Sequence, residues 1–290
     1  MSLKLRKAVV PAAPTKAEQP VLKLTRQSTS PTQFIRDVWG RRQLILLMAR
    51  KDFFVRYRRA SFGVLWAVLL PLLQTSVISI VGLYVLKIRT PGVDYPLFVF
   101  SGLIGYSYFT TTISTAGTAI VDNATLASKI YFPRATLVLS AIWTNAYTGA
   151  INLVLLLILA AIVRAHFGVQ TLLIVPAAAL VIILTTVSSL LLAGLHVYFR
   201  DIRFVVQAIL TVLLYATPVF YSQSRAPHIL RWFLVANPLT GVVELFRKAF
   251  EAADPNWLIA PLVTLGWTLV LAVLALRVQS RNDRVFADLL

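Results

Sequence analysis

The chain has 290 residues, of which 58% are hydrophobic and only 13% are charged, and its mean hydropathy is +0.77. Soluble domains use about 45–50% apolar and about 25% charged residues, so these values exclude an ordinary soluble protein and make the lipid bilayer part of the solvent. The formal net charge is +17, but the basic residues cluster near the N-terminus instead of covering one face, which argues against nucleic-acid binding. The sequence has no cysteine, which excludes disulfides and thiolate metal sites.

The first 61 residues carry 14 of the 28 Lys and Arg residues and only three acidic residues. Within them, residues 1–31 combine basic and polar residues with four prolines, a composition typical of a disordered tail. The apolar run at residues 8–13 is too short for a secretory signal and is interrupted by Pro11. We therefore expect this tail to stay in the cytoplasm.

Residues 32–61 show apolar residues at helical spacing with basic residues between them, which predicts amphipathic helices. Such a helix lies at the membrane surface, where its Lys and Arg residues approach anionic lipid headgroups. The alternative is a basic flank that only keeps the N-terminus inside. The charged residues assigned to this interface helix are Arg50, Lys51, Asp52, Arg56, Arg58 and Arg59.

Six apolar stretches are long enough to cross a bilayer core, which needs about 20 residues of helix. These stretches are residues 63–86, 97–120, 135–163, 171–197, 204–221 and 257–276. With the N-terminus inside, the inner segments carry 21 basic residues and the outer segments carry seven, which is the asymmetry of a positive cytoplasmic side. The sequence therefore predicts an all-α membrane domain of six helices over residues 62–277, with both termini and the tail at 278–290 in the cytoplasm.

Residues 222–256 are too apolar for an ordinary outer loop. Residues 226–236 and 239–252 are each too short to span the membrane, and Asn237-Pro238 divides them. This pattern favours a re-entrant helix pair, and the alternative is two helices lying flat on the outer surface. Glu244 with Lys248, and Arg247 with Glu251, stand at i,i+4 spacing, so we expect one wet face on the second helix.

Sequence motifs for catalysis and nucleotide binding are missing. There is no Walker A pattern, no nucleophile elbow, no zincin motif and no Cys/His cluster, and the three histidines lie far apart, so we expect no metal site. The six stretches contain essentially no ionisable residues, which argues against a proton-coupled transporter and against a charged-ring channel. A pathway for large cargo without its own energy source needs a separate motor.

Aromatic and hydroxyl residues gather in the second and third stretches. Aromatic rings stack on sugar rings and hydroxyls hydrogen-bond with them, so this composition suits a glycan pathway, although interfacial anchoring and helix packing explain such residues equally well. The candidate lining residues are Trp66, Tyr106, Tyr108, Phe109, Trp143 and Tyr147.

The inner loop at residues 122–133 joins the second and third stretches. Asp122 or Asn123 can cap a short helix, and Pro133 can end it. Half of this loop is apolar, which suits a groove on a partner protein better than a solvated turn.

Several short strings of residues follow one another in order along the chain. They are residues 47–59 with 62–67 and 70–71, residues 95–103, Lys129-Ile130-Tyr131-Phe132-Pro133-Arg134, residues 196–202, Thr217-Pro218-Val219 with Tyr221, and Asn237-Pro238-Leu239. Together they resemble the ABC-2 type exporter permeases of the polysaccharide and polyol phosphate family, which are the O-antigen Wzm-like and teichoic-acid exporters. The resemblance covers about residues 40–277.

This resemblance implies a homodimer with one channel between the copies. It also implies two copies of a separate cytoplasmic ATPase that binds MgATP, so that this chain needs no cofactor and is not itself an enzyme. The inner loop would be the coupling helix that docks on the ATPase, and the outer pair would be the periplasmic gate. The coupling residues would be Asp122, Asn123, Leu126, Ser128, Lys129, Ile130, Tyr131, Pro133 and Arg134, and the gate residues Pro218, Tyr221, Asn237, Pro238 and Glu244.

The cargo implied by the resemblance is a glycan or a polyol-phosphate chain, such as O-antigen, teichoic acid or a cell-wall glycan, on a polyprenyl pyrophosphate carrier, exported across the bacterial inner membrane. Arg56, Arg58 and Arg59 stand where the anionic headgroup would approach from the inner leaflet. A permease for a drug or a small lipid is an alternative with the same architecture. A membrane-bound transferase is a further alternative, but it needs an acid/base pair that the sequence does not offer.

Overall fold

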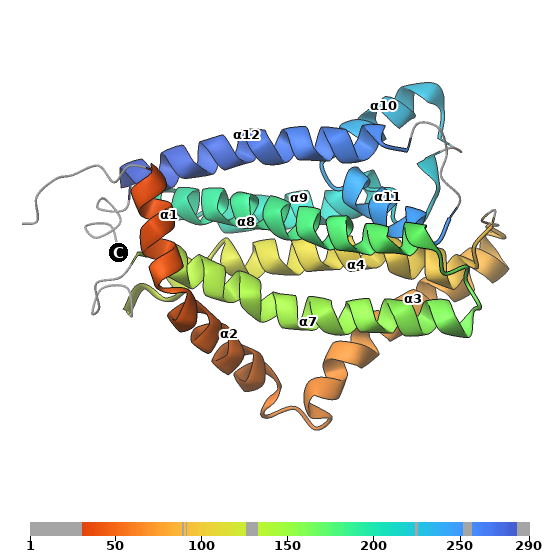
Figure 1. Cartoon of the computed structure of the whole chain (residues 1–290), viewed down its shortest axis with the longest axis horizontal. Helices are drawn as coiled ribbons and strands as arrows, with labels where there is room; N and C mark the ends of the chain where they lie inside the picture. Colours follow the sequence, from red (N-terminus) through yellow and green to blue (C-terminus); the bar gives the residue numbers. More distant parts are fainter. Residues whose placement is uncertain are drawn as a thin grey trace, which may run out of the picture.

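The computed structural model describes residues 31–88, 90, 92–125, 133–223, 226–251 and 257–282. Every regular element among these residues is helical, so the prediction of an all-α protein is confirmed. The long helices run side by side in one bundle, and α2 and α3 leave it at an angle and meet in a V (Figure 1).

The helices follow one another with short connections. In chain order they are α1 (Pro31–Gly40), α2 (Arg42–Tyr57), α3 (Trp66–Ile80), α4 (Tyr95–Ala116), α5 (Ala119–Asp122), α7 (Ala135–Ile162), α8 (Ile174–Tyr198), α9 (Ile202–Ala216), α10 (His228–Ala236), α11 (Thr240–Lys248) and α12 (Ile259–Asn282). A 3₁₀ turn at Gly63–Leu65 leads into α3, a π-helical turn at Val81–Val85 extends it, and a 3₁₀ turn at Val169–Leu173 leads into α8.

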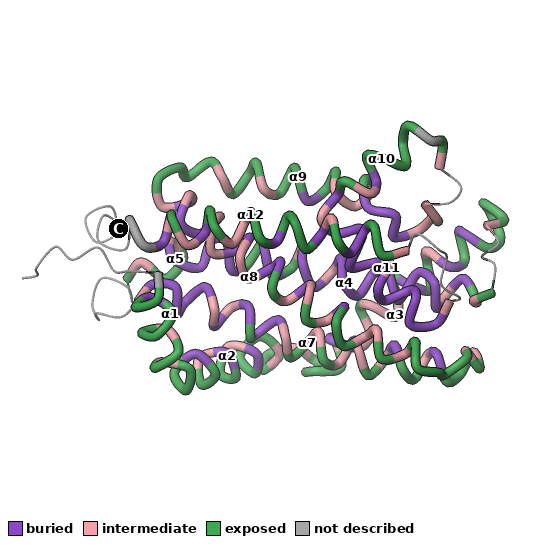
Figure 2. The backbone as a smooth tube through the Cα atoms, turned by 45° about the horizontal axis from the view of Figure 1, so that its top comes forward, coloured by how far each residue is buried: buried purple, intermediate pink, exposed green. Residues whose placement is uncertain are grey.

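Helix α4 is the centre of the bundle. It packs against α3, α7, α8, α9 and α11, and most of its side chains are buried (Figure 2). Small residues let the neighbours approach, as is usual between membrane helices. A Cβ atom on Gly105 would lie 2.6 Å from Val242 Cγ1, so α11 packs directly on the α4 backbone there.

Within the described part of the chain, four helices are long and apolar enough to cross a membrane. They cover Gly63–Val85, Ala135–Ile162, Val169–Tyr198 and Ile259–Gln279. The pair α10 and α11, bent by 91°, counts as a fifth candidate if it is one broken span. All six predicted stretches are helical for most of their length, but length and composition establish only these four to five candidate spans.

The fifth predicted stretch was placed at residues 204–221, but α9 ends at Ala216. Thr217 is extended (φ −100°, ψ 131°), because the ring of Pro218 disfavours a helical residue before it. Fifteen residues of helix span about 22 Å, which is less than the roughly 30 Å of a bilayer core.

The two ends of the described chain lie at the same end of the bundle, where α1 contacts α12. We call this the terminal end, and we call the opposite end, which carries α10 and α11, the distal end (Figure 1). Many large apolar residues of α3, α9 and α12 are exposed. Figure 2 shows where exposed residues lie along these helices. Such surfaces are suited to lipid or to another membrane-embedded chain.

Candidate functional site

Helix α2 packs on α7 through one face and exposes its basic residues on the others. Ile45, Ala49 and Phe53 are buried against the bundle. Lys51 and Asp52 form an ion pair of 3.7 Å at the surface, which contributes little to stability because water screens it. The exposed basic residues of this region are Arg50, Lys51, Arg56, Arg58 and Arg59.

Arg56 differs from the other predicted headgroup residues, because its Nη1 donates a hydrogen bond of 2.9 Å to Asn145 Oδ1 on α7. The Nδ2 of Asn145 donates to Thr115 Oγ1 on α4 at 2.8 Å, and the Thr115 hydroxyl donates to the carbonyl of Thr111 at 3.0 Å. Asn145 lies ten residues beyond the start of α7, which is about 15 Å along the helix. The chain of bonds therefore ties α2, α7 and α4 together well inside the bundle.

Three exposed hydroxyl residues lie on one face of the otherwise buried α4. Thr111, Ser114 and Thr115 follow at i, i+3 and i+4, and we call them the hydroxyl stripe. In a membrane protein, polar side chains normally face a bundle interior or a water-filled cavity instead of lipid. A second protein surface or an aqueous pathway is the environment that suits this stripe.

The predicted lining residues divide into two groups. Tyr106, Tyr108 and Phe109 are buried in the core, and the Tyr106 hydroxyl donates to the carbonyl of Leu210 on α9 at 2.9 Å. A buried ring has no face left for a sugar, so this placement does not agree with the lining role predicted for these three. Trp143 and Tyr147 are exposed on α7, while Trp66 is half-buried beside Phe62, with ring centroids 5.8 Å apart.

A cavity of about 310 Å³ opens between α2 and α7. Its walls are Arg50, Phe53, Phe54 and Tyr147. The Arg50 guanidinium lies 6.0 Å from the centre of the Phe54 ring, and the Phe53 and Tyr147 rings are 5.4 Å apart. One cation among three aromatic rings suits an anionic group that carries an apolar chain.

The predicted coupling segment is described only at its two ends. Asp122 and Asn123 bond to the helix before them, while the helix that they were expected to cap lies mostly outside the described residues. Asp122 Oδ2 accepts a bond of 2.6 Å from the Thr118 hydroxyl, and Asn123 Nδ2 donates to the carbonyl of Ala119 at 2.8 Å. Pro133 is half-buried and Arg134 is buried at the start of α7. The predicted residues Leu126, Ser128, Lys129, Ile130 and Tyr131 lie outside the described residues.

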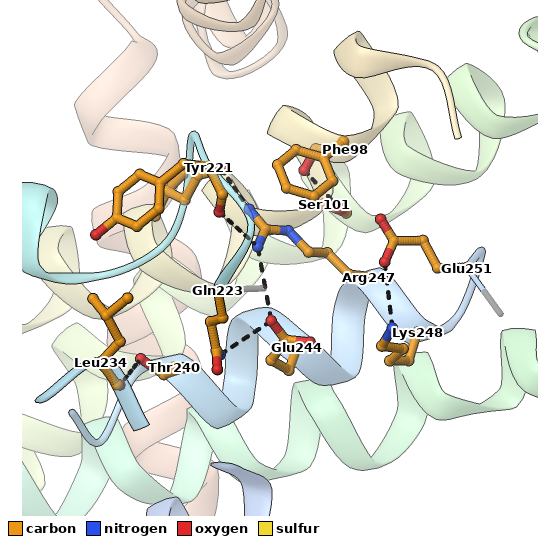
Figure 3. A network of polar contacts seen from close by, with 11 residues as sticks. Phe98, Ser101, Tyr221, Gln223, Leu234, Thr240, Glu244, Arg247, Lys248 and Glu251 are labelled. Atoms are coloured by element: carbon orange, nitrogen blue, oxygen red, sulfur yellow. Dashed lines mark hydrogen bonds and ion pairs between the residues drawn. The ribbon is translucent and has the colours of Figure 1, made fainter. Parts of the chain in front are cut away.

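At the distal end, Arg247 is 2% exposed and joins three parts of the chain. Its Nη2 donates to the carbonyl of Val219 at 2.6 Å, and its Nη1 donates a longer bond of 3.4 Å to the carbonyl of Tyr221. The guanidinium lies 3.7 Å from the centre of the Phe98 ring on α4 (Figure 3). One side chain of α11 thus contacts both α4 and the connection between α9 and α10.

Two ion pairs accompany Arg247 in and after α11. Glu244 Oε1 lies 3.9 Å from Arg247 Nη1 and accepts a hydrogen bond of 3.1 Å from Gln223 Nε2. Lys248 Nζ lies 3.6 Å from Glu251 Oε2. Burial raises the pKa of the Glu251 carboxyl, and the charges of Lys248 and Arg247 oppose this rise.

The sequence predicted different pairs and a wet face for this helix, and both predictions are wrong. The observed pairs are i,i+3 instead of i,i+4, and Arg247 and Lys248 are buried. The reason is that α11 is enclosed by α4, α8 and α12, so its charged face meets protein and not water.

The predicted gate residues surround the bend between α10 and α11. Asn237 Nδ2 donates to the carbonyl of Ala216 and to Thr217 Oγ1, and Asn237 Oδ1 accepts from the Leu239 backbone N–H. This side chain therefore fixes both the bend and the end of α9. Pro218 is buried and Pro238 half-buried, and the Tyr221 hydroxyl donates to the carbonyl of Tyr215 at 2.8 Å.

Comparison with known families gives a match over residues 43–250 to the family described as ABC-2 type transporter. The chain belongs to the ABC-2 type transporter family. The matched residues begin in α2 and end just after α11, so the bonds that join Arg56, Asn145 and Thr115 and the contacts of Arg247 lie within the matched region, and Glu251 lies one residue beyond it. ABC-2 membership confirms the resemblance that the sequence strings indicated.

Curated relatives in this family cover nearly the whole chain. A protein of Klebsiella pneumoniae named O-antigen export system permease protein RfbA is 24% identical over 249 residues, which are 85% of this chain and 95% of the relative. A protein of Myxococcus xanthus with the same name is 27% identical over 221 residues, which are 75% of this chain and 84% of the relative.

Sequence reasoning missed three residues that the structure brings into these networks. Asn145 and Thr115 were part of a polar cluster, but nothing in their spacing distinguished them from packing residues. Arg247 was assigned to the wet face because charged residues are rarely buried.

Among the described residues, no group of three or more His, Asp or Glu could hold a metal ion.

Proposed function

We propose that this chain is the permease subunit of an ATP-driven exporter of O-antigen-type polysaccharide across the bacterial inner membrane. The observation that carries the proposal is its likeness to permeases named for O-antigen export, over 85% of this chain and 95% of the Klebsiella relative. These names favour a polysaccharide over a drug or a small lipid. The role of a transport subunit also agrees with the membership in the ABC-2 family.

The assembly that we propose is a homodimer with two copies of a separate ABC ATPase, which binds MgATP. In this arrangement the terminal end is cytoplasmic and the six predicted stretches all cross the membrane. The second stretch crosses as α4, and the fifth crosses as α9 together with residues 217–221 that follow it. The hydroxyl stripe supports a shared pathway, because a row of hydroxyl groups is unfavourable against lipid. The exposed Trp143 and Tyr147 offer rings on which a sugar could stack. The segment at residues 122–134 faces the ATPase as the coupling helix.

The cargo in this proposal is linked to polyprenyl pyrophosphate, and it approaches along α2. The cavity bounded by Arg50 and three aromatic rings supports this step, because a pyrophosphate can pair with the guanidinium while the prenyl chain lies on the rings. Arg58 and Arg59 add positive charge near the headgroups. Arg56 contributes through Asn145 and so positions α2 on the bundle.

The distal pair α10 and α11 is proposed as a re-entrant gate facing the periplasm. Its bend of 91° and the two short helices, of nine residues each, support a segment that enters the membrane and returns. The contacts of Asn237 hold the bend against the end of α9.

A depletion experiment in the native host tests the function. Without the chain, we expect lipid-linked polysaccharide to accumulate on the cytoplasmic side, and the intact gene should restore export. Depletion of the ATPase partner should give the same accumulation. Normal surface polysaccharide after depletion would contradict the proposal. Changed drug sensitivity with normal polysaccharide would favour a drug permease instead.

A further inference from the structure

The segment at residues 217–223 connects α9 to the gate pair and is anchored by one side chain of α11. Arg247 binds the carbonyls of Val219 and Tyr221, and Glu244, one turn earlier, accepts from Gln223. A backbone carbonyl accepts a hydrogen bond whatever side chain its own residue carries. The anchoring therefore depends on Arg247 itself, and we call this segment the outer strap.

The same guanidinium also presses the outer strap against α4. It stacks on the Phe98 ring, and it lies beside Gly102, where a Cβ atom would be 3.2 Å from both Arg247 Nη2 and the Val219 carbonyl oxygen. The planar fork of arginine suits this position, because it stacks on a ring and donates to two acceptors at once. Figure 3 shows Arg247 between Phe98 and the strap.

The electrostatic compensation of this buried charge is incomplete. Arg247 Nε has no hydrogen-bond partner, the bond to Tyr221 is 3.4 Å long, and the ion pair with Glu244 is 3.9 Å long. A buried charge is costly unless its geometry and hydrogen bonds are excellent, and charged groups inside membrane proteins mark functional positions. Contacts that compensate a buried charge incompletely can break at a low cost in free energy. They therefore suit a contact that opens and closes better than a permanent one.

We infer that Arg247 is a latch: its contacts hold the outer strap closed against α4, and they break each time cargo leaves at the distal end. This inference rests on the proposed transport function. Arg247 acts as a positioning residue, because its partners are the carbonyls of the strap and the ring of Phe98.

The neighbouring cation provides a matched control. Lys248 is 5% exposed, and its ion pair of 3.6 Å is with Glu251, within the same stretch of chain. Substituting Lys248 also removes a buried positive charge from α11, but it keeps the hydrogen bonds of Arg247 to the carbonyls of Val219 and Tyr221. An effect that is specific to the latch must therefore appear in Arg247→Met and be absent from Lys248→Met.

The test is thiol labelling of a cysteine introduced into the strap, and the absence of native cysteine makes the background clean. Val219→Cys replaces a fully buried side chain and keeps the carbonyl that Arg247 binds. Membrane vesicles of both orientations carry the permease with its ATPase partner, and a charged maleimide that cannot cross the membrane is added without nucleotide. Ala193→Cys, buried in α8 at the other end of the bundle, reports general loosening.

We expect Arg247→Met to raise the labelling rate at residue 219 about tenfold, because the strap opens locally more often. Arg247→Lys should give an intermediate rate, and Lys248→Met should stay close to the parent. Labelling at residue 193 should not change. In the parent, MgATP and cargo should raise labelling at residue 219 during turnover.

Three results would overturn the latch: no faster labelling in Arg247→Met, an equal increase in Lys248→Met, or a parallel increase at residue 193. Labelling at residue 219 that ignores turnover in an exporting complex would overturn the cyclic opening. An increase reached only from the cytoplasmic side supports the latch but contradicts the proposed orientation. If labelling without nucleotide is as expected but the complex exports no polysaccharide, the result contradicts the proposed function and not the contacts of the latch.

Discussion

Arginine has opposite environments at the two ends of this molecule. On and just after α2, Arg50, Arg58 and Arg59 are exposed, whereas Arg247 at the distal end is almost completely buried among carbonyls and an aromatic ring. Exposed cations act over a distance on lipid and ligand and are screened by salt, while a buried cation acts only on the groups that touch it. The same residue type can therefore act over a distance along α2, whereas at the distal end it fixes the position of the groups that it touches.

Two glycines allow the largest test of this comparison, because one is tightly enclosed and the other is open. A Cβ atom on Gly241 in α11 would collide with the backbone carbonyl of Ala260 and with Thr264 Oγ1. A Cβ atom on Gly40, at the end of α1, would meet nothing within 4 Å. We expect Gly241→Ala to destabilise the protein by about 1–3 kcal/mol, because α11 and α12 must separate.

Thermal unfolding of the purified permease in detergent measures this difference, with Gly40→Ala as the control. Equal melting temperatures for the two variants would show that the distal end is not packed as tightly as described.

The hydrogen-bond network of Arg56 gives a smaller effect. It shows that an exposed arginine can also be held by a specific contact. Arg56 is exposed, yet it is bonded to Asn145 and through it to Thr115. A double-mutant cycle with Arg56→Met and Asn145→Ala should give a coupling energy of about 1 kcal/mol in unfolding experiments. Arg58→Met in place of Arg56→Met is the control, and coupling of the same size with Arg58 would contradict a specific bond.

The smallest effects are expected for the arginines that lie outside such networks. Arg50→Met, Arg58→Met and Arg59→Met should change stability by less than about 0.5 kcal/mol, since these side chains are exposed. Binding of a polyprenyl phosphate lipid to the purified protein should distinguish them. Arg50→Met should weaken binding most, because Arg50 borders the aromatic cavity. Equal losses for all three would remove the cavity as a specific site.

The sequence was sufficient to predict the helices and the bend between α10 and α11. Long apolar runs and the Asn237-Pro238 pair are local signals, and the local chemistry of a helix or a turn decides the structure there. The end of α9 was predicted five residues too late, although the cause, Pro218, was visible in the sequence.

The direction in which side chains point could not be predicted in the same way. Helix α4 has apolar residues around its whole circumference because protein covers most of it, so its pattern does not distinguish core positions such as Tyr106 from exposed ones such as Thr111. The burial of Arg247 depends on α4, α8 and α12, which are distant in the sequence. The sequence therefore predicted which segments form the candidate site, but it did not predict the contacts between their side chains.

The enclosure of α4 has a consequence for the biogenesis of the protein. Although it has 22 residues, α4 is not among the helices apolar enough to qualify as spans by composition, and most of its surface is covered by helices made later, including α7, α8 and α11. During synthesis, α4 leaves the ribosome before these partners exist. We expect it to insert stably only when they arrive, so that truncation of the nascent chain before α7 leaves α4 poorly retained in the membrane.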